Sequence, residues 1–129
     1  HAILSGKLQT VLGWNLHVDR NPNLRSLCNF PMQANGAEMI RLACSMATES
    51  GITICCQVHD AVLIEAPIHQ IDEAVASMKT FMADASSLVL GGFSLKSDEK
   101  IIRFPDRYTD QRGVQMWETV CDLCGRTAC

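Results

Sequence analysis

The sequence lacks several features that would assign it to a class at once. None of its apolar runs approaches the ~20 residues of a membrane span, and we expect no signal peptide. The net charge of −3 lacks the basic excess that is typical of nucleic-acid-binding proteins. The cysteines, seven in all, are odd in number and scattered through apolar segments. We therefore expect small buried thiols in a reducing compartment at these positions: Cys28, Cys44, Cys55 and Cys56.

The features that are present describe an ordinary globular chain. Hydrophobic residues make up 47% and charged residues 19% of its 129 residues, enough for one sizeable core. We expect a single domain over residues 1–125 and a flexible tail over residues 126–129, in a cytoplasmic protein of a bacterial or phage-infected cell. The chain begins at His1 rather than Met, which suggests a fragment or a processed protein.

Charge is distributed unevenly along the chain. Residues 1–51 hold four basic and three acidic residues, whereas the remainder holds seven basic and eleven acidic ones. Any contact with DNA should therefore come from the first part. The acidic second part suits either a metal-binding face or plain solvent exposure.

The most informative stretch runs from Ile52 to Ala66 and contains two apolar, β-branched runs around a polar pair, His59 and Asp60. Alternation with period two predicts two strands, and the polar pair predicts a tight turn between them. Aspartate suits a turn because it tolerates left-handed backbone and bonds to nearby amides. Both hairpin faces are largely apolar, so we expect burial in a sheet. The carboxylate at the tip is either an ordinary turn residue or a metal ligand on a rigid hairpin.

A second stretch carries polar side chains at regular intervals. Arg25, Asn29 and Gln33 are four residues apart, which places them near one face of a helix. Pro31 disfavours helical backbone at the residue before it, so the sequence predicts a short helix ending near Asn29 and a new helix from Pro31 to about Ser50. We expect this second helix to carry an apolar stripe that faces the core and consists of Met32, Met39, Ala43, Met46 and Ala47.

The remaining segments complete an α+β pattern. Residues 6–18 predict a strand, a turn near Gly13 and a second strand, with His17 facing solvent. A helix is predicted after Pro67, and short strands are predicted at residues 93–96 and 101–104. A last helix should end at Gly125, after a turn or cap at residues 106–110. We therefore expect an antiparallel sheet with helices packed on one face, in a split β-α-β arrangement.

Two strings in this pattern resemble known motifs. Residues 57–60, with the sequence QVHD, are followed by apolar residues and Glu65. This string is similar to motif C of family A DNA polymerases, the bacterial polymerase I type. Residues 25–38, RSLCNFPMQANGAE, resemble the Arg…Asn-x-Pro-Met-Gln segment that precedes motif C in that family by about the same interval. The resemblance spans roughly residues 6–104 and is closest to phage and plasmid-type members.

The resemblance implies a fragment of a polymerase palm, the subdomain that catalyses nucleotidyl transfer. The reaction joins a deoxynucleoside triphosphate to a primer 3′-hydroxyl on a DNA template and needs two divalent ions. Asp60 would be one shared ligand of these Mg²⁺ ions, which prefer oxygen ligands. His59 would be a second catalytic residue, near the primer terminus.

The resemblance also implies contacts with primer-template DNA. Arg25, Asn29 and Gln33 would reach the minor groove, and Gln57 would lie on the strand beside the metal ligand. Every base pair presents an acceptor in that groove, so such donors can check pairing geometry without reading sequence. The alternative is a capped helix start with exposed polar side chains.

The chain departs from the family in two ways. Ala61 stands where the family usually has Glu, which removes an outer carboxylate. Nothing before residue 25 resembles the family's motif A carboxylate or the fingers lysine that grips the triphosphate. We therefore expect no polymerase activity from this chain alone, and self-association through apolar surface that the missing parts would cover. The alternative function is a non-catalytic α+β interaction or oligomerisation module with a vestigial motif.

Two uses of the cysteines are less favoured by the pattern. Cys121 and Cys124, with Cys129, lack the fourth ligand of a structural zinc site. A thiol enzyme built on Cys56 and His59 lacks a third group to orient the histidine.

Overall fold

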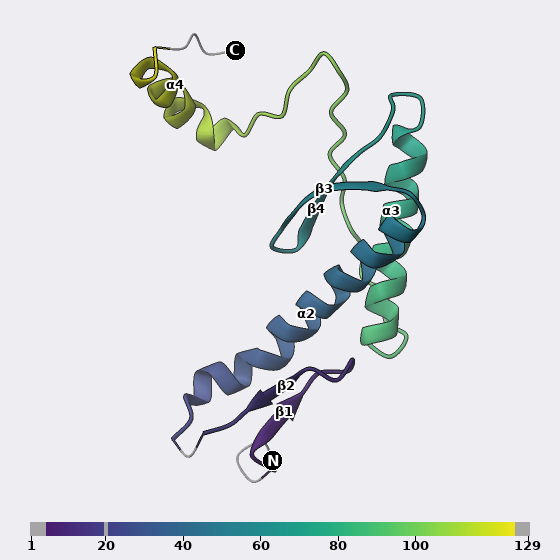
Figure 1. Cartoon of the computed structure of the whole chain (residues 1–129), viewed down its shortest axis with the longest axis vertical. Helices are drawn as coiled ribbons and strands as arrows, with labels where there is room; N and C mark the ends of the chain where they lie inside the picture. Colours follow the sequence, from purple (N-terminus) through teal and green to yellow (C-terminus); the bar gives the residue numbers. More distant parts are fainter. Residues whose placement is uncertain (1–4, 20, 126–129) are drawn as a thin grey trace. The chain divides into compact units, whose positions relative to one another are not determined.

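The computed structural model of the chain describes residues 5–19 and 21–125 (Figure 1). The chain forms two compact units, His1–Glu99 and Lys100–Cys129, whereas the sequence predicted one domain over residues 1–125. The predicted tail over residues 126–129 lies outside the described residues. None of the described helices is both long and apolar enough to cross a membrane.

Strands β1 (Lys7–Gln9) and β2 (Asn15–His17) form the first antiparallel hairpin, as predicted for residues 6–18. Gly13 has a φ of 94°, a left-handed conformation that residues with a Cβ rarely adopt. The turn closes through a 3.1 Å hydrogen bond from the Gly13 N–H to the Thr10 carbonyl. His17 is exposed, as expected of a solvent-facing strand residue.

One continuous helix, α2 (Leu24–Glu49), follows the first hairpin and passes through Pro31. The prediction of two helices separated near Asn29 was therefore wrong. An interior proline costs about 3 kcal/mol because it removes a backbone donor and crowds the preceding turn. The many other hydrogen bonds of this helix, and the packing of its C-terminal half, offset that cost.

Both ends of α2 have a clear physical cause. The Asn23 Oδ1 accepts hydrogen bonds from the Arg25 and Ser26 N–H groups at 3.0 and 3.3 Å, which satisfies two otherwise unpaired donors. The helix ends at Ser50 and Gly51, where it was predicted to end, because Gly51 takes a left-handed φ of 81°.

The core lies where the C-terminal half of α2 meets α3 (Ile71–Val89). Its fully buried members are mostly small, so the two helices can approach closely: Ala43, Ala47, Met78 and Ala85. In the predicted α2 stripe, Ala43 and Ala47 are buried and Met39 and Met46 are half-buried. Met32 is 77% exposed, because it precedes the part of α2 that packs on the core.

Strands β3 (Thr53–Val58) and β4 (Ala61–Glu65) form the second hairpin, with His59 and Asp60 as its turn, which confirms the prediction. Its inner face packs against the helical core through these side chains: Ile54, Val62 and Ile64. The expected burial of both faces was wrong, because each sheet among the described residues has only two strands. In the part of the chain that the structure describes, no third strand joins this sheet, and Val58 and Leu63 on the outer face are exposed.

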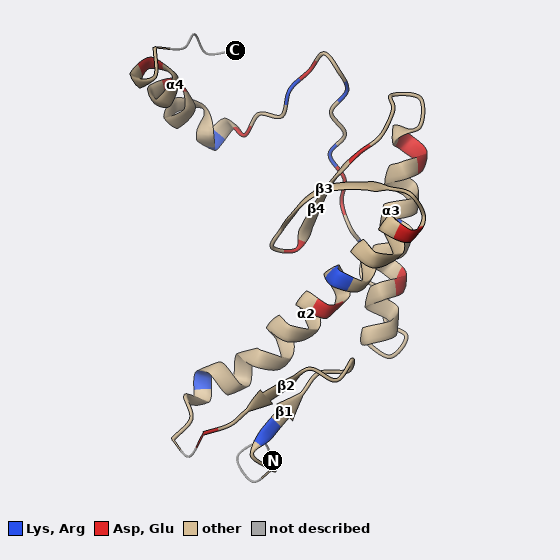
Figure 2. Cartoon of the chain, viewed as in Figure 1, with Lys and Arg blue, Asp and Glu red and all other residues tan. Residues whose placement is uncertain are grey.

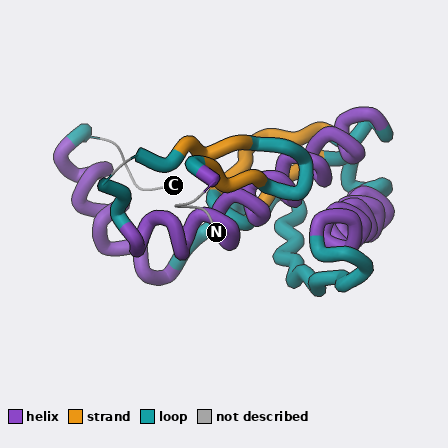
Figure 3. The backbone as a smooth tube through the Cα atoms, turned by 90° about the horizontal axis from the view of Figure 1, so that it is seen from below, coloured by secondary structure: helices purple, strands orange, loops and turns teal. Residues whose placement is uncertain are grey.

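Helix α3 ends at Gly91 and Gly92, both with positive φ. Residues 93–100 and 101–110 then form loop where strands were predicted at 93–96 and 101–104 (teal in Figure 3). The Leu95 N–H donates to the buried Ser86 hydroxyl at 2.8 Å, so a side chain of α3 holds this segment in place of a strand partner. The α+β class is confirmed, with antiparallel strands and helices on one hairpin face, but the last strand of the β-α-β arrangement is absent from the described residues.

The second unit contains the short helix η1 (Gln111–Gly113) and helix α4 (Val114–Leu123). Asp110 caps this pair, because its Oδ1 accepts the Arg112 N–H at 3.0 Å. The predicted cap and final helix are thus confirmed. The apolar side chains of α4 are covered unevenly: Cys121 is buried, but Trp117 is 58% exposed.

Candidate functional site

Asp60 lies at the tip of the second hairpin with its carboxylate open to solvent. His59 and Asp60 are the whole connection between β3 and β4, and both are exposed. Within the described part of the chain, no group donates a hydrogen bond to the Asp60 side chain or forms an ion pair with it. The carboxylate is therefore held at a fixed place on the fold and has no protein partner.

The left-handed residue in this turn is His59, with a φ of 54°, and not the aspartate that the sequence favoured. A positive φ at only the first of two turn residues is the pattern of a type II′ turn, whose twist matches that of antiparallel strands. The unfavourable left-handed backbone conformation of the turn thus falls on His59, and Asp60 keeps an ordinary negative φ.

A β-bulge in β3 decides which way Gln57 faces. The pairing register shifts between Ile54 and Cys56, so that β3 has one residue more than β4 there. Ile54 and Gln57 both line the groove between β3 and α2, although three residues separate them. In a regular strand, residues three apart point to opposite faces. The bulge therefore turns Gln57 toward α2.

The groove between β3 and α2 has a volume of about 500 Å³. Its lining residues come from both elements: Arg41, Cys44, Ser45, Thr48, Glu49, Ile54 and Gln57. The Ser45 and Thr48 hydroxyls donate to carbonyls within α2, at 3.0 and 2.8 Å. The Arg41 guanidinium has no hydrogen bond or ion pair with any described residue, although the Arg41 carbonyl accepts the Ser45 hydroxyl. Arg41 and Gln57 are thus donors on either side of the groove that are available to a ligand.

Arg25, Asn29 and Gln33 all lie on α2, and all three are exposed. Each step of four residues rotates by about 40° around a helix, so the three side chains form one continuous surface. Few other charged residues occur along α2, as Figure 2 shows. The three residues thus share one helix, whereas the predicted break near Asn29 would have placed Gln33 on a second helix. Their role in DNA contact stays a prediction.

The hairpin turn and this helical surface are on connected elements. Strand β3 begins directly after the C-terminal end of α2, and four residues later Gln57 shares a groove with Arg41. The strand therefore runs back along α2, with its turn directed toward the N-terminal half of the helix (Figure 1). The structure brings Gln57 beside α2. Among the described residues, no hydrogen bond joins the turn to Arg25, Asn29 or Gln33.

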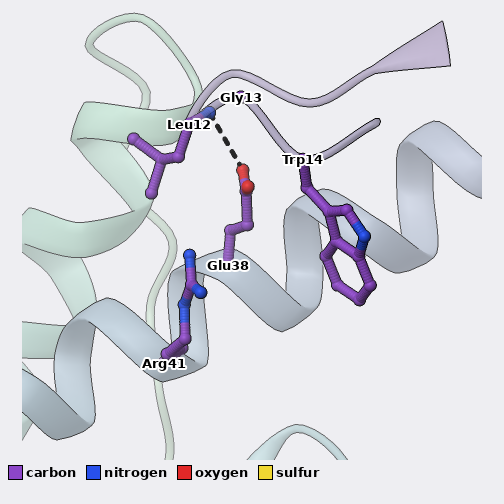
Figure 4. Close-up of a pocket in the computed structure, with 5 residues that line it drawn as sticks. All are labelled: Leu12, Gly13, Trp14, Glu38 and Arg41. Atoms are coloured by element: carbon purple, nitrogen blue, oxygen red, sulfur yellow. Dashed lines mark hydrogen bonds between the residues drawn. The ribbon is translucent and has the colours of Figure 1, made fainter. Parts of the chain in front are cut away.

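Glu38 is a buried residue that the sequence reasoning missed. It is only 1% exposed, and its two oxygens accept hydrogen bonds from the Thr10 hydroxyl at 2.5 Å and the Leu12 N–H at 3.2 Å. Figure 4 shows the carboxylate below the β1–β2 turn, in a cavity of about 400 Å³ that Trp14 and Arg41 also line. Glu38 thus fixes the first hairpin to α2. Glu38 follows the buried Ala34 by four residues, which places both side chains near one face of the helix. This spacing was the signal in the sequence that could have found Glu38.

The metal-binding capacity of the described residues is limited. No three His, Cys, Asp or Glu side chains in the described ranges gather so that they could hold a metal ion. Asp60 is followed by Ala61, so the turn offers one carboxylate. Mg²⁺ in polymerase-type sites uses one or two carboxylates together with waters and substrate phosphates. Asp60 fits such an ion as one ligand of a set that other groups must complete.

Comparisons with models of known protein families, with curated proteins and with solved structures found no match to this chain.

Proposed function

We propose that this chain is part of the palm of a family A DNA polymerase and supplies one metal-binding carboxylate and a set of primer-template contacts. The observation that carries this proposal is the position of Asp60. Its exposed carboxylate has no partner in the described chain and sits on a two-residue turn of a hairpin that packs on α2. The QVHD string around that turn supplies the resemblance.

Asp60 would hold Mg²⁺, and the metal, when bound, would stabilise charge on the reacting phosphate and primer hydroxyl. The hairpin would hold the carboxylate in place, because Ile54 and Ile64 on the inner face of the hairpin pack against the helical core. His59 lies beside Asp60 on the same exposed turn, where its ring can contact the primer end. A single carboxylate cannot hold two ions, so a second one must come from another part of the parent protein.

The exposed surface of α2 supports the DNA contacts. Arg25, Asn29 and Gln33 each offer N–H donors, and minor-groove acceptors occupy similar positions in all four base pairs. Helix α2 holds these donors at fixed spacing, which favours a check of base-pair geometry over sequence reading. Gln57, turned toward α2 by the bulge, adds a donor at the hairpin.

Activity belongs to the parent protein in this proposal. The chain alone has one carboxylate at the turn, Ala61 in place of a second, and no counterpart of the triphosphate-gripping lysine before residue 25. With primed template, Mg²⁺ and all four nucleotides, we expect no extension above that of a mock preparation. Template-dependent extension by the pure chain would contradict this part of the proposal.

Primer-template binding is the more direct test of the chain itself. We expect a labelled primer-template duplex to bind weakly, with an affinity that falls as salt rises. Arg25→Ala should weaken binding through lost charge, and Gln33→Ala should weaken it by about 1 kcal/mol through a lost hydrogen bond. Lys96→Ala is the control, because it removes an exposed positive charge from the loop after α3 and not from α2. Equal effects of Arg25→Ala and Lys96→Ala in anisotropy titrations would contradict the proposed interface.

An interaction or oligomerisation module is the second candidate, and the outer face of the hairpin favours it. Val58 and Leu63 are 55% and 57% exposed there, although apolar β-strand side chains are usually covered. A second copy could cover this face. Light scattering at high micromolar concentration should then give a mass above that of the monomer, and Leu63→Lys should restore the monomer.

A further inference from the structure

Two neighbouring cysteines, Cys55 and Cys56, are exposed on β3, although the sequence predicted that they would be buried. Cys28 is also exposed and Cys44 is only half-buried. The error arises because, among the described residues, the sheet of β3 and β4 has no third strand. A deprotonated thiol is a soft, strongly nucleophilic ligand, so two neighbouring thiols in solvent can act together on one ligand.

The bulge places both thiols on one face of the hairpin. In a regular strand, neighbouring side chains point to opposite faces. Here Ile54 and Gln57 both line the groove toward α2, and the register shift leaves one extra residue between Ile54 and Cys56. The two residues between the groove-facing positions, Cys55 and Cys56, therefore both face away from α2, which agrees with their exposure.

The spacing of the two thiols favours a bridging ion over a disulfide. Consecutive Cα atoms are about 3.8 Å apart, whereas disulfide-bonded residues usually have Cα atoms about 4.4–6.8 Å apart. A direct S–S bond between neighbours is therefore strained. An ion between the two sulfurs relieves that strain because the sulfur atoms can stay farther apart.

We propose that Cys55 and Cys56 form a two-thiolate binding site for a soft, thiophilic metal ion of low coordination number, of which Cu(I) is the type. Thiolate is the ligand that selects Cu(I). The balanced step is Cu⁺ plus two thiols giving a bis-thiolate complex of charge −1 and two released protons. No electron transfer is involved, and the site does not depend on the polymerase assignment.

Other ions and other cysteines fit less well. Zn²⁺ in protein sites takes four ligands, and no third His, Cys, Asp or Glu in the described ranges joins this pair. Burial raises the pKa of the Cys44 thiol, which disfavours the thiolate that a metal needs. Cys121 is buried, while Cys28 and Cys124 are exposed but have no neighbouring cysteine in sequence.

An anaerobic competition titration of the folded chain with Cu(I) and a chromophoric Cu(I) chelator tests the site. The background variant carries Cys28→Ser, Cys124→Ser and Cys129→Ser, which removes the other exposed thiols and the one outside the described residues. We expect this variant to bind one Cu(I) as tightly as the wild-type chain does. Adding Cys55→Ser or Cys56→Ser should weaken binding roughly 100-fold, because the second thiolate acts at high effective concentration.

A face-swap variant tests the bulge itself. Cys56→Gln combined with Gln57→Cys keeps the number of thiols but moves one to the groove side, so it should also lose tight binding. Wild-type protein provides a check that needs no variant: Cu(I) should protect Cys55 and Cys56 together from alkylation, as read by mass spectrometry. Unchanged affinity in both single-serine variants, no competition by the wild-type chain, or protection of other cysteines instead would each overturn the proposal.

Discussion

The two hairpins of the first unit differ most at their turns. The β1–β2 turn is tied to α2, because the buried Glu38 accepts hydrogen bonds from Thr10 and Leu12. The β3–β4 turn has a carboxylate of its own, Asp60, but no described group pairs with it. One hairpin is thus fastened at its tip by an acidic side chain, and the other presents an acidic side chain to solvent.

The comparison distinguishes a carboxylate that holds the fold together from one that is free to bind a ligand. A buried carboxylate must be hydrogen-bonded, because an unpaired one is strongly disfavoured. A solvent-exposed carboxylate on a rigid hairpin keeps its oxygens free for a cation. Figure 4 shows Glu38 bonded to the Leu12 N–H below the first turn, and its other oxygen accepts the Thr10 hydroxyl. Both oxygens are engaged, so Glu38 cannot serve the role that we assign to Asp60.

The largest effect is expected from Asp60→Asn in a full-length protein that contains this chain. Asparagine keeps the size of aspartate and suits a turn, so the hairpin should survive. The lost metal ligand should lower the primer-extension rate by about 1,000-fold or more, since about 1.4 kcal/mol corresponds to each tenfold. DNA binding should change little. Glu65→Gln, on the same hairpin but away from the tip, is the control, and near-normal turnover of Asp60→Asn would refute the metal-ligand role.

Substitution of Glu38, which fastens the β1–β2 turn to α2, should change the stability of the fold rather than the activity. Glu38→Ala leaves the Thr10 hydroxyl and the Leu12 N–H without their buried acceptor, which should cost about 1–3 kcal/mol of unfolding free energy. Glu38→Gln should cost less, because its amide oxygen can still accept one bond. Urea unfolding measures both, with the exposed Glu49→Ala as control. Equal stability of Glu38→Ala and Glu49→Ala would show that the contact contributes nothing.

The smallest effect concerns Asp110, a partly exposed carboxylate that does have a partner. Hydrogen bonds from the Arg112 side chain, and then from its backbone, lower the Asp110 pKa from 3.8 to about 2. Because the folded pKa is the lower one, the cap stabilises its helix above about pH 4, and this contribution is lost as the pH falls toward 2. Arg112→Ala should raise the Asp110 pKa in an NMR titration. Arg107→Ala removes an exposed positive charge that donates no hydrogen bond to Asp110, and an identical shift in both variants would contradict the assignment.

The sequence predicted the second hairpin well, because its alternation and polar pair are strong local signals. It also predicted α3 and the end of α2 at Gly51, where glycine supplies the left-handed backbone. It failed at Pro31, because local rules about proline carry no information on the packing that keeps the long helix intact.

The remaining errors concern tertiary context. Strands were predicted at residues 93–96 and 101–104, but a strand needs a partner strand. Residues 94 and 95 instead bond to α3: the Leu95 N–H donates to the Ser86 hydroxyl and the Ser94 hydroxyl donates to the Ala83 carbonyl. The bulge at Cys55 could not be predicted, since it depends on the register between two strands of unequal length. The role of Glu38 also depends on the first hairpin lying over α2. The hairpin tip of the candidate site was thus predictable from sequence, whereas the direction of Gln57 was not.

Metal-directed cleavage of the backbone tests the central claim, that Asp60 holds the catalytic ion, most directly. A full-length protein containing this chain would be loaded with Fe²⁺ in place of Mg²⁺, bound to primer-template DNA and a nucleotide, and treated with peroxide. Radicals formed at the ion cut the chain close to its ligands. We expect cuts near residues 57–63 that disappear in Asp60→Asn, and none at the β1–β2 turn. Cuts absent from the second hairpin, or unchanged by Asp60→Asn, would contradict it.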